Sequence, residues 1–224
     1  MKFVFLPGMD GTGLLFNELI LNIPKEIDRE VVCLNEIQGV SYRQQAEQIA
    51  EKIESSSVVV VAESYSGRIA YELCNILGSR VSKVVFIASF VSCPGRLAKL
   101  AAVLPECVLK PNLFPNWLMK VLCFDGRGNR ALMDQVRQAI AQVGPSVLKQ
   151  RLLNIAELDE PKGHQSTTAV YIRPTNDHLV AYDAIKVLGN IYPQLSIESV
   201  EGGHFIAQTA PESCARVIVR AKTT

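Results

Sequence analysis

The feature that most constrains the fold is the alternation of short strand-like runs with helical patterns. The runs are rich in β-branched residues and begin at Phe3, Val31, Val58, Lys83, Thr168 and Leu195. Those near residues 3, 58 and 84 are continuously apolar, as is typical of strands covered on both faces. Strands that alternate with helices are typical of βαβ units. The sequence therefore predicts an α/β fold with a mostly parallel central sheet flanked by helices.

Two of the intervening segments carry clear helix signals. The segment 41–54 begins with Ser41, which can form a capping box with Gln44. Its apolar residues fall on one helical face: Ala46, Ile49, Ala50 and Ile53. A second helix is predicted from about residue 66 to residue 77, because Gly78 is a favourable residue just after a helix end.

The segment from Phe90 to about Gln165 interrupts the alternation. It contains four apolar helical stretches separated by prolines: 97–104, 117–124, 132–143 and 147–158. A parallel crossover needs only about a dozen or more residues, so the length favours a helical lid inserted between two strands over ordinary connecting helices. The whole chain, 1–224, fits a single domain with this lid at about 90–165.

Composition excludes several other classes of protein. The chain has 23 basic and 22 acidic residues, a net charge of +1, and its basic residues are scattered, which argues against nucleic acid as a partner. Six cysteines without a CxxC pair suit free thiols in a reducing compartment, with no metal site. The apolar runs are too short for a signal peptide or a membrane span. We therefore expect a soluble cytoplasmic protein; the sequence does not indicate its oligomeric state.

The strongest local signal is VVVVAESYSGRIA, in which a buried strand leads through Ser64 directly into a helix. A serine at such a sharp turn has strained backbone geometry and an exposed hydroxyl above the sheet. Small residues are needed two positions to either side, and Ala62 and Ser66 meet this need. The helix N-terminus would stabilise developing negative charge. The segment predicts a nucleophile at Ser64; the alternative is that Ser64 only caps the helix.

A glycine-rich loop, LPGMDGTGLLF, follows the first strand. It is not a Walker loop, because Leu14 stands where a lysine would be needed, and it lacks the third glycine of a dinucleotide fingerprint. The remaining functional interpretation is an oxyanion loop, in which the N–H of Met9 joins that of Tyr65 to bind an oxyanion. A simple glycine turn is the alternative.

The chain has three histidines that could serve as a base for Ser64: His164, His178 and His204. Asp177 follows a predicted strand and precedes a helix expected near Val180, and His204 follows the last strand after two glycines. The order Ser64, Asp177, His204 is the chain order of an α/β-hydrolase triad. His178 is the competing base, but it adjoins Asp177 and is expected to point elsewhere. His164 lies in a polar stretch and is expected to be a solvated loop residue.

At these residues the sequence resembles the α/β-hydrolase superfamily over nearly the whole chain. The matching segments are PGMDGTG (oxyanion loop), AESYSG (nucleophile elbow), TNDHLV (acid turn) and GGHFIAQTAPE (histidine loop). The resemblance implies Ser64 as nucleophile, His204 as general base, Asp177 as its partner, and Met9 and Tyr65 as backbone oxyanion donors. The elbow departs from the family pattern, because alanine and serine replace its two usual glycines.

The expected reaction is hydrolysis of a carboxylic ester or thioester through an acyl-enzyme on Ser64, without a cofactor. The substrate is expected to be a small molecule with an apolar acyl group, because the lid is rich in apolar residues; no individual substrate-binding residue is predicted. Two alternatives remain: an acyltransferase of the same fold, and a non-catalytic small-molecule receptor that uses the hydrolase fold.

Overall fold

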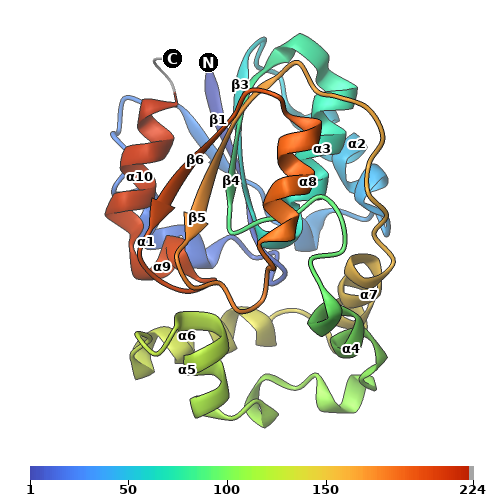
Figure 1. Cartoon of the computed structure of the whole chain (residues 1–224), viewed down its shortest axis with the longest axis vertical. Coiled ribbons are helices and arrows are strands. Elements are labelled where there is room, and N and C mark those ends of the chain that lie inside the picture. Colours follow the sequence, from blue (N-terminus) through green and yellow to red (C-terminus); the bar gives the residue numbers. More distant parts are fainter. Residues whose placement is uncertain (222–224) are drawn as a thin grey trace.

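The computed structural model describes residues 1–221. Its centre is a six-stranded sheet in which every neighbouring pair of strands is parallel (Figure 1). The strand order is β2-β1-β3-β4-β5-β6. The strands are β1 (Lys2–Leu6), β2 (Arg29–Val31), β3 (Val58–Glu63), β4 (Val81–Ile87), β5 (Thr168–Pro174) and β6 (Leu195–Val200). The predicted parallel sheet is confirmed, although the strand expected from Val31 occupies residues 29–31 instead.

The direction in which the chain adds strands to the sheet reverses at β1. The chain goes from β1 to β2 on one side and then returns to β3 on the other side of β1. In open parallel sheets, ligands bind beyond the carboxyl ends of the strands at such a switch point. The loop after β1 and the turn after β3 meet there, because Leu6 and Ala62 are register partners.

Helices cover both faces of the sheet (Figure 1). The helices α2 (Tyr42–Lys52), α3 (Gly67–Leu77) and α8 (Asp183–Ile191) lie on one face, and α1 (Asn17–Leu21), α9 (Ile206–Thr209) and α10 (Pro211–Arg220) lie on the other. Each face has its own apolar cluster: Ile49, Ile69 and Leu188 are buried in the first, and Leu19 and Ile218 in the second. Continuous apolar strands are therefore buried from both sides, as their sequence predicts.

Helix signals in the sequence correspond closely to the observed helices. The Ser41 side chain accepts a hydrogen bond from the Gln44 N–H, and the Gln44 side chain completes the predicted capping box. Helix α3 ends at residue 77, before Gly78, as predicted. The helix expected near Val180 instead begins at residue 183. The Asp177 carboxylate accepts the N–H groups of residues 179 and 180, which holds these residues in a turn.

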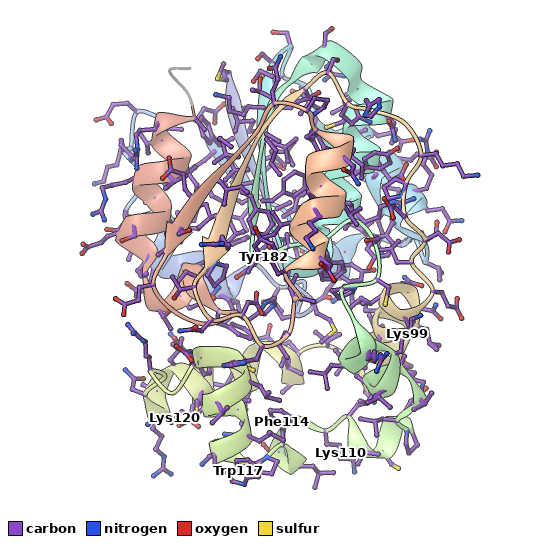
Figure 2. The ribbon with its side chains drawn as sticks, in the orientation of Figure 1. Lys99, Lys110, Phe114, Trp117, Lys120 and Tyr182 are labelled. Atoms are coloured by element: carbon purple, nitrogen blue, oxygen red, sulfur yellow. The ribbon has the colours of Figure 1, made fainter. Side chains whose placement is uncertain are left out.

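An insertion between β4 and β5, residues 90–165, lies beyond the carboxyl edge of the sheet (Figure 1). It contains α4 (Arg96–Val103), α5 (Asn116–Phe124), α6 (Arg130–Ala141) and α7 (Pro145–Ala156). Helices α5 and α6 pack around a third apolar cluster that includes Met119, Phe124 and Val136. Figure 2 shows Phe114, Trp117 and Lys120 at the end of the insertion that is farthest from the sheet.

The base of the insertion is closed by hydrogen bonds between its two ends. The Cys93 N–H donates to the Leu158 carbonyl at 2.9 Å. The Arg68 guanidinium donates to the carbonyls of Val91 and Asp159, at 3.0 and 2.9 Å. Short 3-10 turns complete the structure: η1 (Leu14–Phe16), η2 (Leu34–Glu36), η3 (Ser64–Ser66), η4 (Gly78–Arg80), η5 (Glu106–Val108) and η6 (Pro111–Leu113).

Candidate active site

Ser64 occupies the turn between β3 and α3. Its φ of 47° lies in the left-handed region, which non-glycine residues adopt only under constraint. The constraint comes from its neighbours. The Ser66 hydroxyl donates to the Pro7 carbonyl, and a Cβ at residue 67 would collide with the Ser89 hydroxyl. Position 67 therefore has no room for a side chain and requires glycine. Positions 62 and 66, where the family usually has glycine, accept the small side chains of alanine and serine.

Ser64, His204 and Asp177 form a continuous hydrogen-bond chain. The Ser64 Oγ lies 2.9 Å from His204 Nε2, and His204 Nδ1 lies 2.9 Å from Asp177 Oδ2. His204 is buried, while Ser64 keeps part of its surface exposed. The structure therefore brings together the three side chains that the sequence singles out, although they come from three distant segments.

The histidine loop is held against the insertion. The Phe205 N–H donates to the Cys123 carbonyl at 3.0 Å, and the Phe205 ring packs on Phe124 with ring centroids 5.2 Å apart. Phe124 is fully buried. The end of α5 therefore fixes the backbone immediately after His204.

Burial and charge act in opposite directions on His204 and Asp177. Burial favours neutral His204, but the Asp177 carboxylate, with a smaller contribution from Glu63, outweighs it and raises the pKa of His204. Burial likewise opposes the charge of Asp177, but His204 and the backbone N–H groups of Val180 and Leu179 outweigh it and lower the pKa of Asp177. The site therefore stabilises an imidazolium paired with a carboxylate.

Glu63 is a buried carboxyl group immediately before Ser64. Burial raises its pKa to about 7, although a hydrogen bond from Gln208 opposes this shift. The Gln208 Nε2 donates to Glu63 Oε1 at 3.0 Å. The Asp10 carboxylate adds to the upward shift in pKa, whereas His204 and the Gly8 N–H oppose it. Glu63 therefore changes charge near neutral pH, next to the candidate nucleophile.

The loop after β1 passes close to Ser64 and has its carbonyl groups occupied. A Cβ on Gly8 would lie 3.8 Å from Ser64 Cβ. The Gly8 carbonyl accepts from the Gly11 N–H at 3.0 Å. Because a trans peptide points its C=O and N–H in opposite directions, this bond directs the Met9 N–H away from the interior of the loop.

The peptide between Ser64 and Tyr65 is held in a similar way. The Ser89 hydroxyl donates to the Ser64 carbonyl at 2.6 Å, and the Gly67 N–H donates to the same carbonyl. Ala88, with φ of 45°, turns the chain after β4 immediately before Ser89. The fixed carbonyl sets the opposite direction for the Tyr65 N–H. Both predicted oxyanion donors therefore belong to peptide groups whose carbonyls are already bound.

Arg151 connects the insertion to the glycine-rich loop. It lies on α7, is 4% exposed, and donates through Nη1 to the Met9 carbonyl at 2.8 Å and through Nη2 to Asn35 Oδ1 at 3.0 Å. A Cβ at Gly11 would lie 2.5 Å from Arg151 Nη1, so the guanidinium fills the space that this glycine leaves open. Burial lowers the pKa of Arg151, partly offset by Tyr65 and Asp10.

The other two histidines lie outside the chain of hydrogen bonds at Ser64. His178 is exposed, and its Nε2 lies 3.4 Å from Asp125 Oδ1. His164 is also exposed and contacts the Asn190 carbonyl through Nδ1 at 2.7 Å. Within residues 1–221 no group of three or more histidine, cysteine or acidic side chains could hold a metal ion. In the same part of the chain, no helix combines the length and apolarity needed to cross a bilayer.

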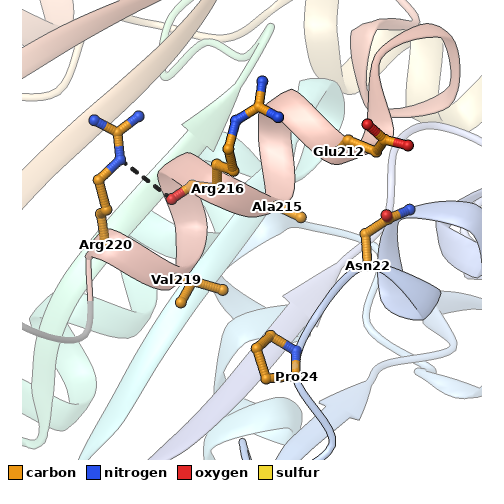
Figure 3. Close-up of a pocket in the computed structure, with 7 residues that line it drawn as sticks. All are labelled: Asn22, Pro24, Glu212, Ala215, Arg216, Val219 and Arg220. Carbon is orange, nitrogen blue, oxygen red and sulfur yellow. Dashed lines mark hydrogen bonds between the residues drawn. The ribbon is translucent and has the colours of Figure 1, made fainter.

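Two surface hollows lie away from Ser64. One of about 570 Å³ lies between the end of α1 and α10, where Arg220 donates to the Arg216 carbonyl (Figure 3). A second, of about 340 Å³, lies between η2 and the turn from α6 to α7, with Arg151 in its lining. Neither is lined by Ser64, Asp177 or His204, so neither identifies a substrate pocket.

Sequence reasoning missed three residues that hold the site together: Glu63, Ser89 and Arg151. Glu63 gave a usable signal, because an acidic residue ends an otherwise apolar buried strand. Ser89 and Arg151 gave none. Their roles depend on contacts with Ser64 and Met9 that span 25 and 142 positions of the chain.

No protein-family model matches the sequence, and no curated protein matches it. Solved structures do match over the whole chain. A hydrolase from Oleispira antarctica has a TM-score of 0.81 at 14% identity, covering 100% of this chain and 91% of that protein. An esterase from Exiguobacterium antarcticum gives 0.82 at 14%, with 100% and 92% coverage. A thioesterase of the prodiginine pathway in Streptomyces coelicolor gives 0.71 at 16%, with 100% and 89% coverage. At these identities the likeness shows a common fold.

Proposed function

We propose that this chain, which has the α/β-hydrolase fold, is a serine hydrolase that cleaves a carboxylic ester or thioester. The observation that carries the proposal is the hydrogen-bond chain from Ser64 Oγ through His204 to Asp177. The strained backbone of Ser64 also supports it, because such a turn exposes the hydroxyl beyond the sheet.

In the acylation step, Ser64 Oγ attacks the substrate carbonyl while His204 Nε2 takes its proton. Asp177 holds the imidazole through Nδ1 and stabilises its charged form. The N–H groups of Met9 and Tyr65 stabilise the oxyanion that forms, because their peptide groups are fixed before the substrate arrives. The imidazolium then protonates the leaving alcohol or thiol, and the acyl group stays on Ser64.

In the deacylation step, His204 takes a proton from water, which attacks the acyl-enzyme. A second tetrahedral oxyanion forms at the same two N–H groups. Its collapse releases the carboxylic acid and returns the proton from His204 to Ser64. Every proton is carried by the protein or the reactants, so the cycle uses no cofactor.

The neighbours support the proposed reaction class. The solved structures of this fold are named as an esterase, a thioesterase and a hydrolase. We assign the insertion at residues 90–165 the role of a lid, because it covers the carboxyl edge of the sheet where Ser64 lies (Figure 1). Its apolar residues favour a substrate with an apolar acyl group.

The decisive experiment is labelling with a fluorophosphonate, read by intact mass. Wild-type protein should gain one adduct, because a serine activated by His204 attacks the phosphorus centre. The Ser64→Ala and His204→Ala variants should gain none, and Ser64→Ala should reduce kcat on a nitrophenyl ester by a factor on the order of 10⁶.

The matched control is His178→Ala, which removes a histidine that does not contact Ser64. This variant should be labelled like the wild type. Near-normal ester turnover by folded Ser64→Ala would refute the assignment of the nucleophile. Labelling without release of free acid in water would instead indicate transfer to another acceptor.

A further inference from the structure

The insertion exposes large apolar side chains from α4 to α5. Leu100 and Val103 on α4 are 64% and 76% exposed, Leu113 in η6 is 56% exposed, and Trp117 on α5 is 69% exposed. We call these four residues, together with Val108 and Val121, the tip surface. Scattered apolar residues are normal on protein surfaces, but a gathering of them on one small segment indicates a binding surface.

Helices α4 and α5 each have exposed apolar side chains that do not pack in the core of the described residues. Helix α4 buries only Ala102, and α5 buries Met119, Cys123 and Phe124 against the third apolar cluster. Trp117 and Val121, both exposed, lie on the side of α5 opposite Met119 and Cys123. The apolar content of these helices therefore exceeds what their packing in the described residues uses.

The charges around the tip surface are mainly positive. Residues 94–124 contain four basic side chains and a single acidic one, Glu106, whereas the whole chain carries a net charge of only +1. The basic side chains are all exposed: Arg96, Lys99, Lys110 and Lys120. None of the four forms an ion pair with another residue in 1–221. Their charges are thus available to an external anionic surface.

We propose that the tip surface docks on the headgroup region of an anionic lipid bilayer. Tryptophan and lysine suit this region, because each combines an apolar body with a polar end. Apolar insertion and electrostatic attraction together give interfacial binding. A bilayer also fits the position of the part of the surface around Lys110 and Trp117: this part lies at one end of the long axis of the molecule, so it reaches a flat membrane before the sheet does (Figures 1 and 2).

A lipid surface explains the arrangement better than a protein partner. The apolar side chains come from four short elements, and lysines stand between them in the sequence. Such a mixed surface lacks the charge-depleted centre of a protein interface. Docking by this end would turn the carboxyl edge of the sheet, with Ser64, toward the membrane. The binding itself does not depend on the proposed hydrolase activity.

The single tryptophan makes the test direct, because all indole emission comes from Trp117. The probes are vesicles of phosphatidylcholine alone and vesicles that also contain about one third phosphatidylglycerol. We expect the protein to sediment with the anionic vesicles and its emission to shift to shorter wavelength. Raising the salt concentration should reverse both changes, because salt screens the attraction between exposed charges.

The triple variant Lys99→Gln, Lys110→Gln, Lys120→Gln should bind anionic vesicles about 100-fold more weakly, since each basic residue near the surface contributes roughly 1 kcal/mol. The matched control changes three exposed lysines elsewhere, Lys25, Lys52 and Lys162, to glutamine. It should bind like the wild type. For the apolar contribution, Trp117→Ser should also weaken sedimentation, whereas Leu21→Ser, at an exposed leucine on α1, should not.

Three outcomes would overturn the proposal. The first is an unchanged Trp117 emission with no sedimentation on anionic vesicles. The second is equal weakening by the tip and control lysine variants, which would indicate general attraction of a charged protein. The third is a dimer in solution that dissociates on Trp117→Ser, which would assign the tip surface to a second copy of the chain. Far-ultraviolet circular dichroism of each variant checks that it is folded, and serine labelling tests the hydrolase function separately.

Discussion

At the scale of single residues, the site collects features that are unfavourable elsewhere in a protein. Ser64 has a left-handed backbone, a strain of roughly 1–3 kcal/mol, and Glu63 brings a carboxyl group into the core. Ser66 and Gly67 hold the turn at Ser64, and Gln208 donates a hydrogen bond to the Glu63 carboxyl group. Local sequence rules singled out Ser64 as a candidate nucleophile but could not reveal that burial raises the pKa of the residue before it to about 7.

Replacement of Glu63 by glutamine tests this titration. Because the pKa of Glu63 rises from 4.5 to about 7 on folding, its contribution to stability is fully present below pH 4.5 and is lost as the pH rises through 7. Glu63→Gln cannot ionise and keeps an acceptor for Gln208. Relative to wild type, the variant should therefore gain about 3 kcal/mol in free energy of unfolding between pH 4.5 and pH 8.

Urea unfolding at several pH values measures this difference. The matched control is Glu198→Gln, which removes an exposed carboxyl group on β6. A constant difference between Glu63→Gln and wild type across the whole range would show that Glu63 has the same pKa in the folded and unfolded chain.

At the scale of elements, prediction succeeded where the signal is local. The capping box at Ser41, the glycine after α3 and the apolar runs of β1, β3 and β4 each lie within a few residues of the element they specify. It failed where a distant group decides. The turn at residues 179–180 depends on the Asp177 side chain, and the fixed carbonyls of Met9 and Ser64 depend on α7 and on Ser89.

The link from α7 to the loop after β1 predicts a kinetic effect. Arg151→Gln should lower kcat at least about 10-fold, because the Met9 carbonyl loses a charged donor worth roughly 1.5–3 kcal/mol and the loop loses its fixed orientation. KM should change less, since the Met9 N–H that this loop positions binds the oxyanion rather than the bound ester. Steady-state kinetics on a nitrophenyl ester provide the measurement.

Arg151→Lys should recover part of kcat, because one donor can still reach the Met9 carbonyl. Arg130→Gln is the matched control. Arg130 is exposed on α6 and pairs with Asp134 on the same helix, not with the Met9 carbonyl. Equal kcat for Arg151→Gln and wild type would mean that the loop keeps its orientation without α7.

At the scale of the whole molecule, the α/β-hydrolase fold is confirmed, and the order of motifs along the sequence was enough to predict it. The tip surface could not be predicted. Helical periodicity indicates that a helix has an apolar face, but whether that face finds a partner depends on how the elements assemble. Leu100 and Val136 look alike in the sequence, yet one is exposed and the other is buried.

The three apolar clusters differ in size, which predicts that the free energy of local unfolding differs between parts of the molecule. The cluster of α5 and α6 is smaller than the two clusters on the sheet, so these helices should open locally before the sheet unfolds. Val136→Ala should speed amide hydrogen exchange in residues 116–141 and leave β3 and β4 unchanged, as measured by mass spectrometry of peptic fragments.

Val60→Ala provides the comparison, because Val60 lies at the centre of the sheet and its loss should speed exchange throughout the domain. If Val136→Ala instead raised exchange equally in the insertion and in the sheet, the molecule would unfold as a single cooperative unit.

The insertion is attached to the rest of the molecule at several points besides its own chain ends. At one end Arg151 holds the Met9 carbonyl and Asn154 donates to the Val40 carbonyl; at the other the Cys123 carbonyl holds the Phe205 N–H and Asn176 donates to Asp125. A rigid body that is pinned at one point can swivel in any direction, whereas one pinned at two separate points can turn only about the line that joins them. The insertion has more than two such points, so no line through two of them is a free axis of rotation while the bonds last. The attachments therefore keep the spacing between Met9 and His204, and a tilt of the insertion as one body has to break some of these bonds.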